Sequence, residues 1–168
     1  MKQALIFLSF FAVIVSCTPD KKTLADKITK LETSATAPQE KLDQAIGEEL
    51  FENYDEFFEN FPQDSLTPQM LYKGGQIAIL YEQNLRASDY LSKLIKDFPT
   101  NDKTPDAYMV LGNFYANKIH DLDRAKALYD DFISRYPDHA LIPQVQLMKE
   151  TLGMTPDEML EYIQANNK

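Results

Sequence analysis

The sequence has no tryptophan, one cysteine and only five glycines among its 168 residues. A single cysteine excludes an internal disulfide framework and any metal site built from several thiolates. The shortage of glycine, in a chain where leucine, alanine, lysine, glutamate and aspartate dominate, favours helices over sheets. Hydrophobic residues still make up 44% of the chain, which favours a globular over a disordered protein. We therefore expect one globular domain of the all-α class.

Positive charge is also scarce. The chain has 17 lysines and arginines against 26 aspartates and glutamates, which gives a formal net charge of -9. Proteins that bind the phosphate backbone of nucleic acids need clustered lysines and arginines. We therefore expect no nucleic-acid partner.

The N-terminus, residues 1–17, has the features of a secretory signal peptide. Lys2 supplies a minimal positive region, and an apolar run from Ala4 to Val15 is broken only by Ser9. A membrane-spanning helix needs about 20 apolar residues, so this run is too short to be one. Its length is typical of a signal-peptide core. A buried core helix would show a polar face, and this run has none.

The apolar run ends in Ile14-Val15-Ser16-Cys17, which resembles the lipobox of bacterial lipoproteins. In that family the cysteine is diacylated and becomes the first residue of the mature protein, and more than one acyl chain makes anchoring stable. The resemblance implies a membrane anchor at Cys17, with residues 18–39 as a short tether and a first amphipathic helix. We expect the outer membrane of the cell envelope. No acidic run follows the cysteine, a run that would resemble the surface-export signal of some bacterial lipoproteins, so we expect the periplasmic face. An ordinary secreted protein is the alternative.

Hydrophobic spacing predicts two helices before the first repeat boundary. Residues 21–32 place Leu24, Ile28 and Leu31 on one side of a helix. A loop is expected over 33–38, where polar residues precede a proline. A second helix, over 40–60, is predicted by apolar residues at every third or fourth position: Leu42, Ile46, Leu50, Tyr54, Phe57 and Phe58.

The stretch that contains the second of these helices carries most of the chain's net negative charge. Between Glu40 and Leu66 there are nine acidic residues and one lysine. We interpret its glutamates as a solvated face, with a binding surface for a basic segment as the alternative. Calcium is not expected, because hard-cation sites need carboxylates that converge from a loop rather than spread along one helix.

A repeat of 37 and 38 residues divides the chain. It is marked by three aromatic-proline pairs: Phe61-Pro62, Phe98-Pro99 and Tyr136-Pro137. The prolines that follow them recur at the same intervals: Pro68, Pro105 and Pro143. Thr67 and Thr104 precede the first two of these prolines, and we expect them to be N-caps before a first-turn proline.

Small residues keep the same interval. Gly74 and Gly112 correspond, as do Ala87 and Ala125. A glycine inside a helix costs about 1 kcal/mol relative to alanine, so a packing gain is expected to offset it. We expect each glycine on a first helix to face the alanine on the second helix, which lets the two axes approach closely. A kink or break at Gly74-Gly75 is the alternative.

The best-preserved unit resembles the tetratricopeptide repeat (TPR), a helical hairpin of about 34 residues. The residues that carry the resemblance are Tyr108, Leu111, Gly112, Tyr115, Ala125, Tyr129, Phe132 and Pro137. The unit here is a few residues longer, a form that resembles the TPR domains of two bacterial envelope proteins. These are the TPR lipoprotein of the outer-membrane β-barrel assembly machine and the periplasmic coordinator of the Tol–Pal system. The resemblance implies a TPR-like α-α superhelix over residues 40–168.

About four helical hairpins are expected. The resemblance is good for residues 105–137, fair for 67–99 and degenerate elsewhere. The last hairpin would consist of Ile142–Leu152 and Pro156–Ala165, with Thr155 as the cap of its second helix. Degenerate end units are typical of solenoids, whose terminal repeats need a polar outer face.

The sequence shows no catalytic or cofactor motif. His120 and His139 are isolated, and we interpret each as a surface or cap residue. Gly74-Gly75 lacks the lysine and hydroxyl residue of a phosphate-binding loop, and no Ser-His-Asp order or metal-ligand pair occurs. We therefore expect no enzyme, no cofactor and no metal.

In TPR stacks the first helix of each hairpin lines a concave groove. The groove positions that the resemblance implies here are Leu71, Gly75, Ala78, Ile79, Met109, Asn113, Ala116, Asn117, Leu147 and Thr151. Asn113 stands where some TPR domains use an asparagine and a lysine to hold a carboxylate, but Met109 replaces the lysine. An apolar, amide-lined groove for a segment of another protein is therefore expected. The alternative is that these residues only pack against neighbouring helices.

Two functions are compatible with these expectations. The first is a lipid-anchored TPR scaffold that mediates protein-protein interactions in the bacterial cell envelope, in outer-membrane assembly or organisation. The second is a substrate-capturing lipoprotein that holds a peptide or glycan for a neighbouring transporter or enzyme. A third class, an envelope hydrolase, would need a catalytic pair that the sequence does not contain.

Overall fold

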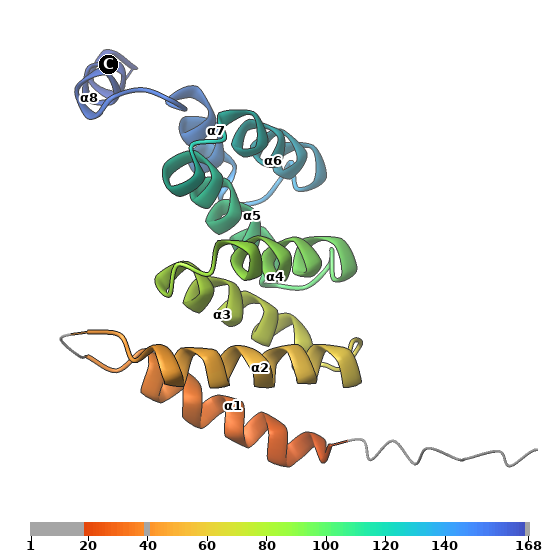
Figure 1. The fold of residues 1–168 in the computed structure, drawn as a ribbon. Helices are drawn as coiled ribbons and strands as arrows, with labels where there is room; N and C mark the ends of the chain where they lie inside the picture. Colours follow the sequence, from red (N-terminus) through yellow and green to blue (C-terminus); the bar gives the residue numbers. More distant parts are fainter. Residues whose placement is uncertain (1–18, 39–40, 167–168) are drawn as a thin grey trace, which may run out of the picture.

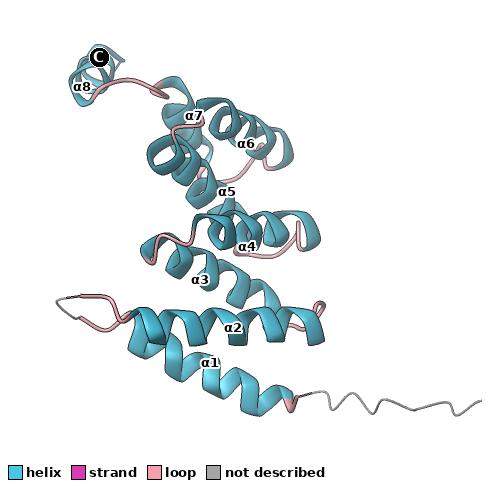
Figure 2. Ribbon diagram, in the orientation of Figure 1, coloured by secondary structure: helices cyan, strands magenta, loops and turns pink. Residues whose placement is uncertain are grey.

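The computed structural model describes residues 19–38 and 41–166, which form helices and connecting loops without a strand (Figure 2). The predicted signal peptide and Cys17 lie outside these ranges. The helices are α1 (Lys21–Ala35), α2 (Gln44–Asn60), α3 (Thr67–Leu80), α4 (Asn84–Asp97), α5 (Thr104–Asn113), the π-helix η1 (Phe114–Ile119), α6 (Leu122–Arg135), α7 (Ile142–Glu150) and α8 (Pro156–Asn166). None of them is long and apolar enough to cross a membrane. The all-α prediction is confirmed.

Neighbouring helices pack as hairpins that stack on one another (Figure 1). α1 packs on α2, α3 on α4, and α5 with η1 on α6, while α2–α3, α4–α5 and α6–α7 contacts join the hairpins. The predicted superhelix of helical hairpins is confirmed. The last expected hairpin, formed by α7 and α8, is not closed. α8 stands apart at one end of the stack and buries none of its residues (Figure 1).

The first helix is longer than predicted. α1 runs to Ala35, three residues into the expected loop. Ala35 is fully buried, and its carbonyl oxygen accepts a hydrogen bond from Tyr81 Oη at 3.2 Å. This contact with the end of α3 holds the last turn of α1 in helical form.

The turns between hairpins share a hydrogen bond at the aromatic-proline pairs. Phe61 and Phe98 follow α2 and α4, and their carbonyl oxygens accept bonds from the hydroxyls of Thr67 and Thr104 at 2.7 and 2.6 Å. The prediction that these threonines are N-caps is wrong, because each one lies inside its helix, one residue after the cap position. Both threonines are fully buried and bond backwards to the preceding helix, so they tie successive hairpins together.

A second side chain completes each of these turns. Asp64, Asn101 and His139 each accept a hydrogen bond from the backbone N–H two residues later, at 3.0, 3.0 and 3.2 Å. Side chains of this kind stabilise turns by standing in for a backbone carbonyl. His139 therefore has the same structural role as an aspartate and an asparagine in the two earlier turns.

The π-helix η1 accounts for the one residue by which the second repeat interval, of 38 residues, exceeds the first, of 37 residues. Glu82 and His120 both have a φ of 59° and end the first helix of their hairpins. Glu82 lies 15 residues after Thr67, whereas His120 lies 16 residues after Thr104, the corresponding threonine of the next hairpin. A π-helical turn contains more residues than an α-helical turn, so η1 absorbs this additional residue while the helix still ends in the same kind of turn.

The helix glycines make room for aromatic rings. A Cβ added at Gly112 would lie 2.4 Å from Tyr129 Cε1, whereas one added at Gly74 would lie 3.1 Å from the nearest ring atom. Close approach is therefore present at both glycines, but the nearest side chains are tyrosines and not Ala87 and Ala125. The reason is size, because a ring from a neighbouring helix fills the space that a glycine leaves. α3 is continuous through Gly74, so it contains no break.

This difference predicts unequal effects of two matched substitutions. Gly112→Ala should lower the free energy of unfolding by about 1–3 kcal/mol, because the added methyl group overpacks against the Tyr129 ring. That ring is held by a 3.1 Å hydrogen bond to Asn113 and has little freedom to move. Gly74→Ala should change stability by less than about 1 kcal/mol, because a small shift of its neighbours suffices and alanine favours the helix. Urea unfolding followed by circular dichroism measures both, and equal losses would contradict the assignment.

Candidate functional site

A series of pockets follows the first helices of the hairpins, and we call this series the odd-helix groove. Two pockets, of about 200 and 520 Å³, lie between α1 and α3. A third, of about 440 Å³, lies between α3 and α5 with η1, and a fourth, of about 380 Å³, lies where η1 meets α6, α7 and the start of α8. The residues that line it include Lys73, Gln76, Leu80, Asn113, Asn117 and His120.

Shared residues connect these pockets in two pairs. The two pockets between α1 and α3 share Glu32 and Lys73, and the two around η1 share Asn113 and Asn117. The second and third pockets share no residue, but both reach the end of α3, where Leu80 lines the second and Ile79 lines the third. The pockets therefore follow the first helices of all three packed hairpins.

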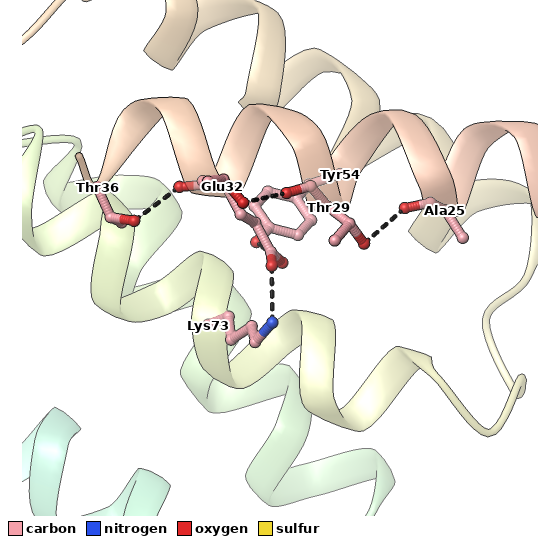
Figure 3. A network of polar contacts seen from close by, with 7 residues as sticks. Ala25, Thr29, Glu32, Thr36, Tyr54 and Lys73 are labelled. Atoms are coloured by element: carbon pink, nitrogen blue, oxygen red, sulfur yellow. Dashed lines mark hydrogen bonds and ion pairs between the residues drawn. The ribbon is translucent and has the colours of Figure 1, made fainter.

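At the N-terminal end of the groove, one carboxylate joins three helices (Figure 3). Glu32 of α1 is only 9% exposed. Its Oε1 accepts a hydrogen bond from Tyr54 Oη of α2 at 2.7 Å, and its Oε2 pairs with Lys73 Nζ of α3 at 2.7 Å. Burial, together with the Glu32 charge, raises the pKa of Tyr54, so the phenol remains a donor. Both carboxylate oxygens are satisfied, which favours one fixed geometry for the three helices.

Lys73 brings positive charge to the surface of this part of the groove. Its side chain is 42% exposed, whereas that of Glu32 is 11% exposed. An ammonium group has three donors, and Glu32 takes one of them. Lys73 can therefore also bind a carbonyl or carboxylate oxygen of a ligand in either flanking pocket.

At the other end of the groove, amide groups lie beside methionines. Asn113 Oδ1 accepts a hydrogen bond from Tyr129 Oη at 3.1 Å, which leaves the Asn113 amide nitrogen as a donor. Asn117 and His120 line the same pocket from η1 and the turn after it. The apolar lining consists mainly of Leu122, Met148, Leu152, Met154 and Met159. Amides can pair with a peptide backbone, and flexible thioethers adapt to varied apolar side chains.

Some of the groove residues predicted from the sequence line the pockets, and others do not. Asn113 and Asn117 line pockets, whereas Leu147 is 38% exposed but lies outside them. Leu71 and Ala78 are fully buried, so the prediction that they line the groove is wrong.

The rotation of α3 explains this correction. Leu71 and Ala78 share a helix face with Gly75, where an added Cβ would lie 2.5 Å from Leu91 Cγ of α4. That face packs into the hairpin, and the row of Lys73, Gln76 and Leu80 lines the groove instead. Met109 of α5 is half-buried against the core. It lines none of the four pockets in the described part of the chain.

Sequence reasoning missed Glu32, Lys73 and the methionine cluster. Glu32 continues the row of Leu24 and Ile28 at a spacing of four, and a charged residue in a buried row is a detectable signal. Lys73 has no comparable signal, because its partner lies 41 positions away. The methionines come together only because the loop after α7 brings α8 to the end of the groove.

No family model matches the sequence, and no curated protein gives a significant match. Within the two described ranges, no group of three or more histidine, cysteine, aspartate or glutamate side chains is placed to hold a metal ion. The chemistry available in the odd-helix groove is therefore hydrogen bonding, the two accessible ammonium groups of Lys73 and Lys118, and apolar contact.

The Glu32 network predicts a strong effect on stability. Glu32→Ala should lower the free energy of unfolding by about 2–3 kcal/mol, because it leaves the buried Tyr54 hydroxyl without its acceptor. Glu49→Ala is the matched control, since its 3.0 Å pair with Lys27 is half-exposed on both sides and should contribute less than about 1 kcal/mol. Chemical denaturation of both variants tests this, and a Glu32→Ala loss no larger than that of the control would exclude the supporting role.

Proposed function

We propose that this chain is a lipid-anchored, TPR-like scaffold that binds a segment of another cell-envelope protein along the odd-helix groove. The observation that carries the proposal is the series of pockets along the first helices of three hairpins. A groove of this length suits an extended or helical segment better than a compact metabolite. The absence of a recognisable catalytic constellation among the groove residues is compatible with binding rather than catalysis.

The groove chemistry indicates how such a segment would be held. Leu80 is 48% exposed, and with Ile79 and Val110 it offers apolar contact at the centre of the groove. Asn113 and Asn117 offer amide groups that can pair with a peptide backbone. Apolar contact at the centre with polar groups near both ends is the usual anatomy of a protein-binding surface.

One pocket also favours a second candidate function, the capture of a peptide or glycan for a neighbouring transporter or enzyme. The pocket around Asn113, Asn117 and His120 has a volume of about 380 Å³, within the range of small-ligand sites. Titration of the full chain with peptide and glycan libraries distinguishes the two functions. Saturable binding of short ligands supports capture, and its absence supports the scaffold.

Binding along the groove should depend on Leu80. Leu80→Glu places a charge on the apolar centre, and we expect it to reduce partner recovery from crosslinked membranes at least about tenfold. Leu85→Glu is the matched control, because Leu85 is 83% exposed on α4 and lines none of the groove pockets. Quantitative mass spectrometry of the recovered proteins measures both. Equal recovery by the two variants and the unchanged chain would rule out the groove as the contact surface.

The anchor makes a separate prediction. Cys17→Ala should move the protein from the membrane fraction to a soluble or unprocessed form, because no acyl chain can then be attached. Ser16→Ala should stay in the membrane fraction, since a small residue is tolerated at that lipobox position. Membrane fractionation with immunoblotting measures the distribution. A Cys17→Ala protein that remained membrane-bound and processed would exclude the lipid anchor.

A further inference from the structure

Within residues 19–38 and 41–166, the C-terminal helix α8 has little tertiary support: Met159 lines the pocket at the end of the odd-helix groove, and Tyr162 and Ile163 are half-buried. None of its residues is buried, and Met159 and Leu160 are 38% and 56% exposed. Among the described residues, one side-chain hydrogen bond joins it to α7, from Tyr162 Oη to Glu150 Oε2 at 2.6 Å. α8 stands clear of the stacked hairpins in Figure 1.

The local sequence of α8 nevertheless specifies a helix. Thr155 and Glu158 form a reciprocal cap: the Thr155 N–H donates to Glu158 Oε2 at 2.8 Å, and the Glu158 N–H donates to Thr155 Oγ1 at 3.3 Å. Acidic residues occupy the first turn, where they complement the helix dipole. An isolated helix of 11 residues is still marginal in water, because helical stability in proteins comes mainly from packing. The described residues provide little of that packing, so a contact with another molecule would stabilise α8.

The two faces of α8 define the chemistry of that contact. Helical spacing places Met159, Leu160 and Ile163 on one side. It places the acidic residues Asp157, Glu158 and Glu161 on the opposite side, and α8 contains no lysine or arginine. The helix thus offers a narrow apolar stripe on a negatively charged body.

Three kinds of occupant could cover the apolar stripe of α8: a membrane surface, a second copy of the chain or a different protein. The charge pattern disfavours the first two. A membrane surface is disfavoured, because interfacial helices carry lysine and arginine on their polar face and bind anionic lipids. A second copy of the chain is disfavoured by its net charge of -9. Most lysines and arginines in the described ranges also already lie in ion pairs with the chain's own acids.

We propose that α8 docks through Met159, Leu160 and Ile163 into an apolar groove of a different protein, and that lysines and arginines border that groove. The apolar stripe supplies the contact area, as in other complexes where an amphipathic helix lies in a groove. The acids speed association and favour basic partners over acidic ones. Met159 also lines the end of the odd-helix groove, but Leu160 and Ile163 line none of its pockets, so this second surface does not rest on the first.

A photocrosslinking experiment on the full chain in its membrane tests this inference. Benzoyl-phenylalanine replaces Leu160 on the apolar face or Ala165 on the acidic side as the matched control. We expect a discrete crosslink to another protein from position 160, at least tenfold above position 165. Mass spectrometry should place the crosslinked atom in an apolar groove flanked by lysines and arginines. Crosslinks only to a second copy, only to lipid, or equal from both positions would overturn the proposal.

Two variants separate docking from folding and from the odd-helix groove. Leu160→Glu together with Ile163→Asn should leave the thermal unfolding midpoint unchanged, because α8 buries no residue, and should abolish recovery of the crosslinked partner by the otherwise unchanged chain. Leu80→Glu should leave the crosslink from position 160 intact. Partner recovery that was lost with Leu80→Glu but kept with the α8 changes would assign the partner to the odd-helix groove and reject α8 docking.

Discussion

The contact of large side chains with helix glycines is the constraint on which the rest of the structure depends. An added Cβ at Gly47, Gly75 or Gly112 would lie within 2.5 Å of a Tyr81, Leu91 or Tyr129 side-chain atom, respectively. Each missing side chain lets a neighbouring helix approach to a distance that no other residue would allow. Because these contacts recur within and between hairpins, they determine how each helix is rotated and where the next hairpin can stack.

The odd-helix groove is a consequence of this rotation. The Gly75 contact turns Leu71 and Ala78 into the hairpin and leaves the row that contains Lys73 and Leu80 at the surface. The same rotation brings Lys73 to Glu32, where one carboxylate connects α1, α2 and α3. A rigid N-terminal section and a methionine-lined C-terminal section then lie at the two ends of one surface. Such a surface can hold one end of a segment firmly while adapting to the other.

The two ends of the stack differ in how well the terminal helix packs on its neighbours. At the N-terminal end, α1 buries Leu24, Ile28 and Ala35 and is held by the Glu32 network. At the C-terminal end, α7 packs on α6, but α8 extends beyond it with Met159 and Leu160 exposed. The proposed scaffold function would use surface that lies outside the core, and here that surface consists of the odd-helix groove and α8.

The sequence by itself determined the helices, the repeat interval and the pairing of the first three hairpins, because hydrophobic spacing and the aromatic-proline pairs are local features. It also placed Asn113 and Asn117 correctly on the helix that reaches the pockets. It did not predict that α8 stands apart from α7. It did not determine which row of α3 faces outward, that Thr67 and Thr104 bond backwards, or that Glu32 meets Lys73. Those outcomes were decided by the tertiary structure. They depend on how helices rotate against partners distant in the sequence, and only side-chain packing determines that rotation.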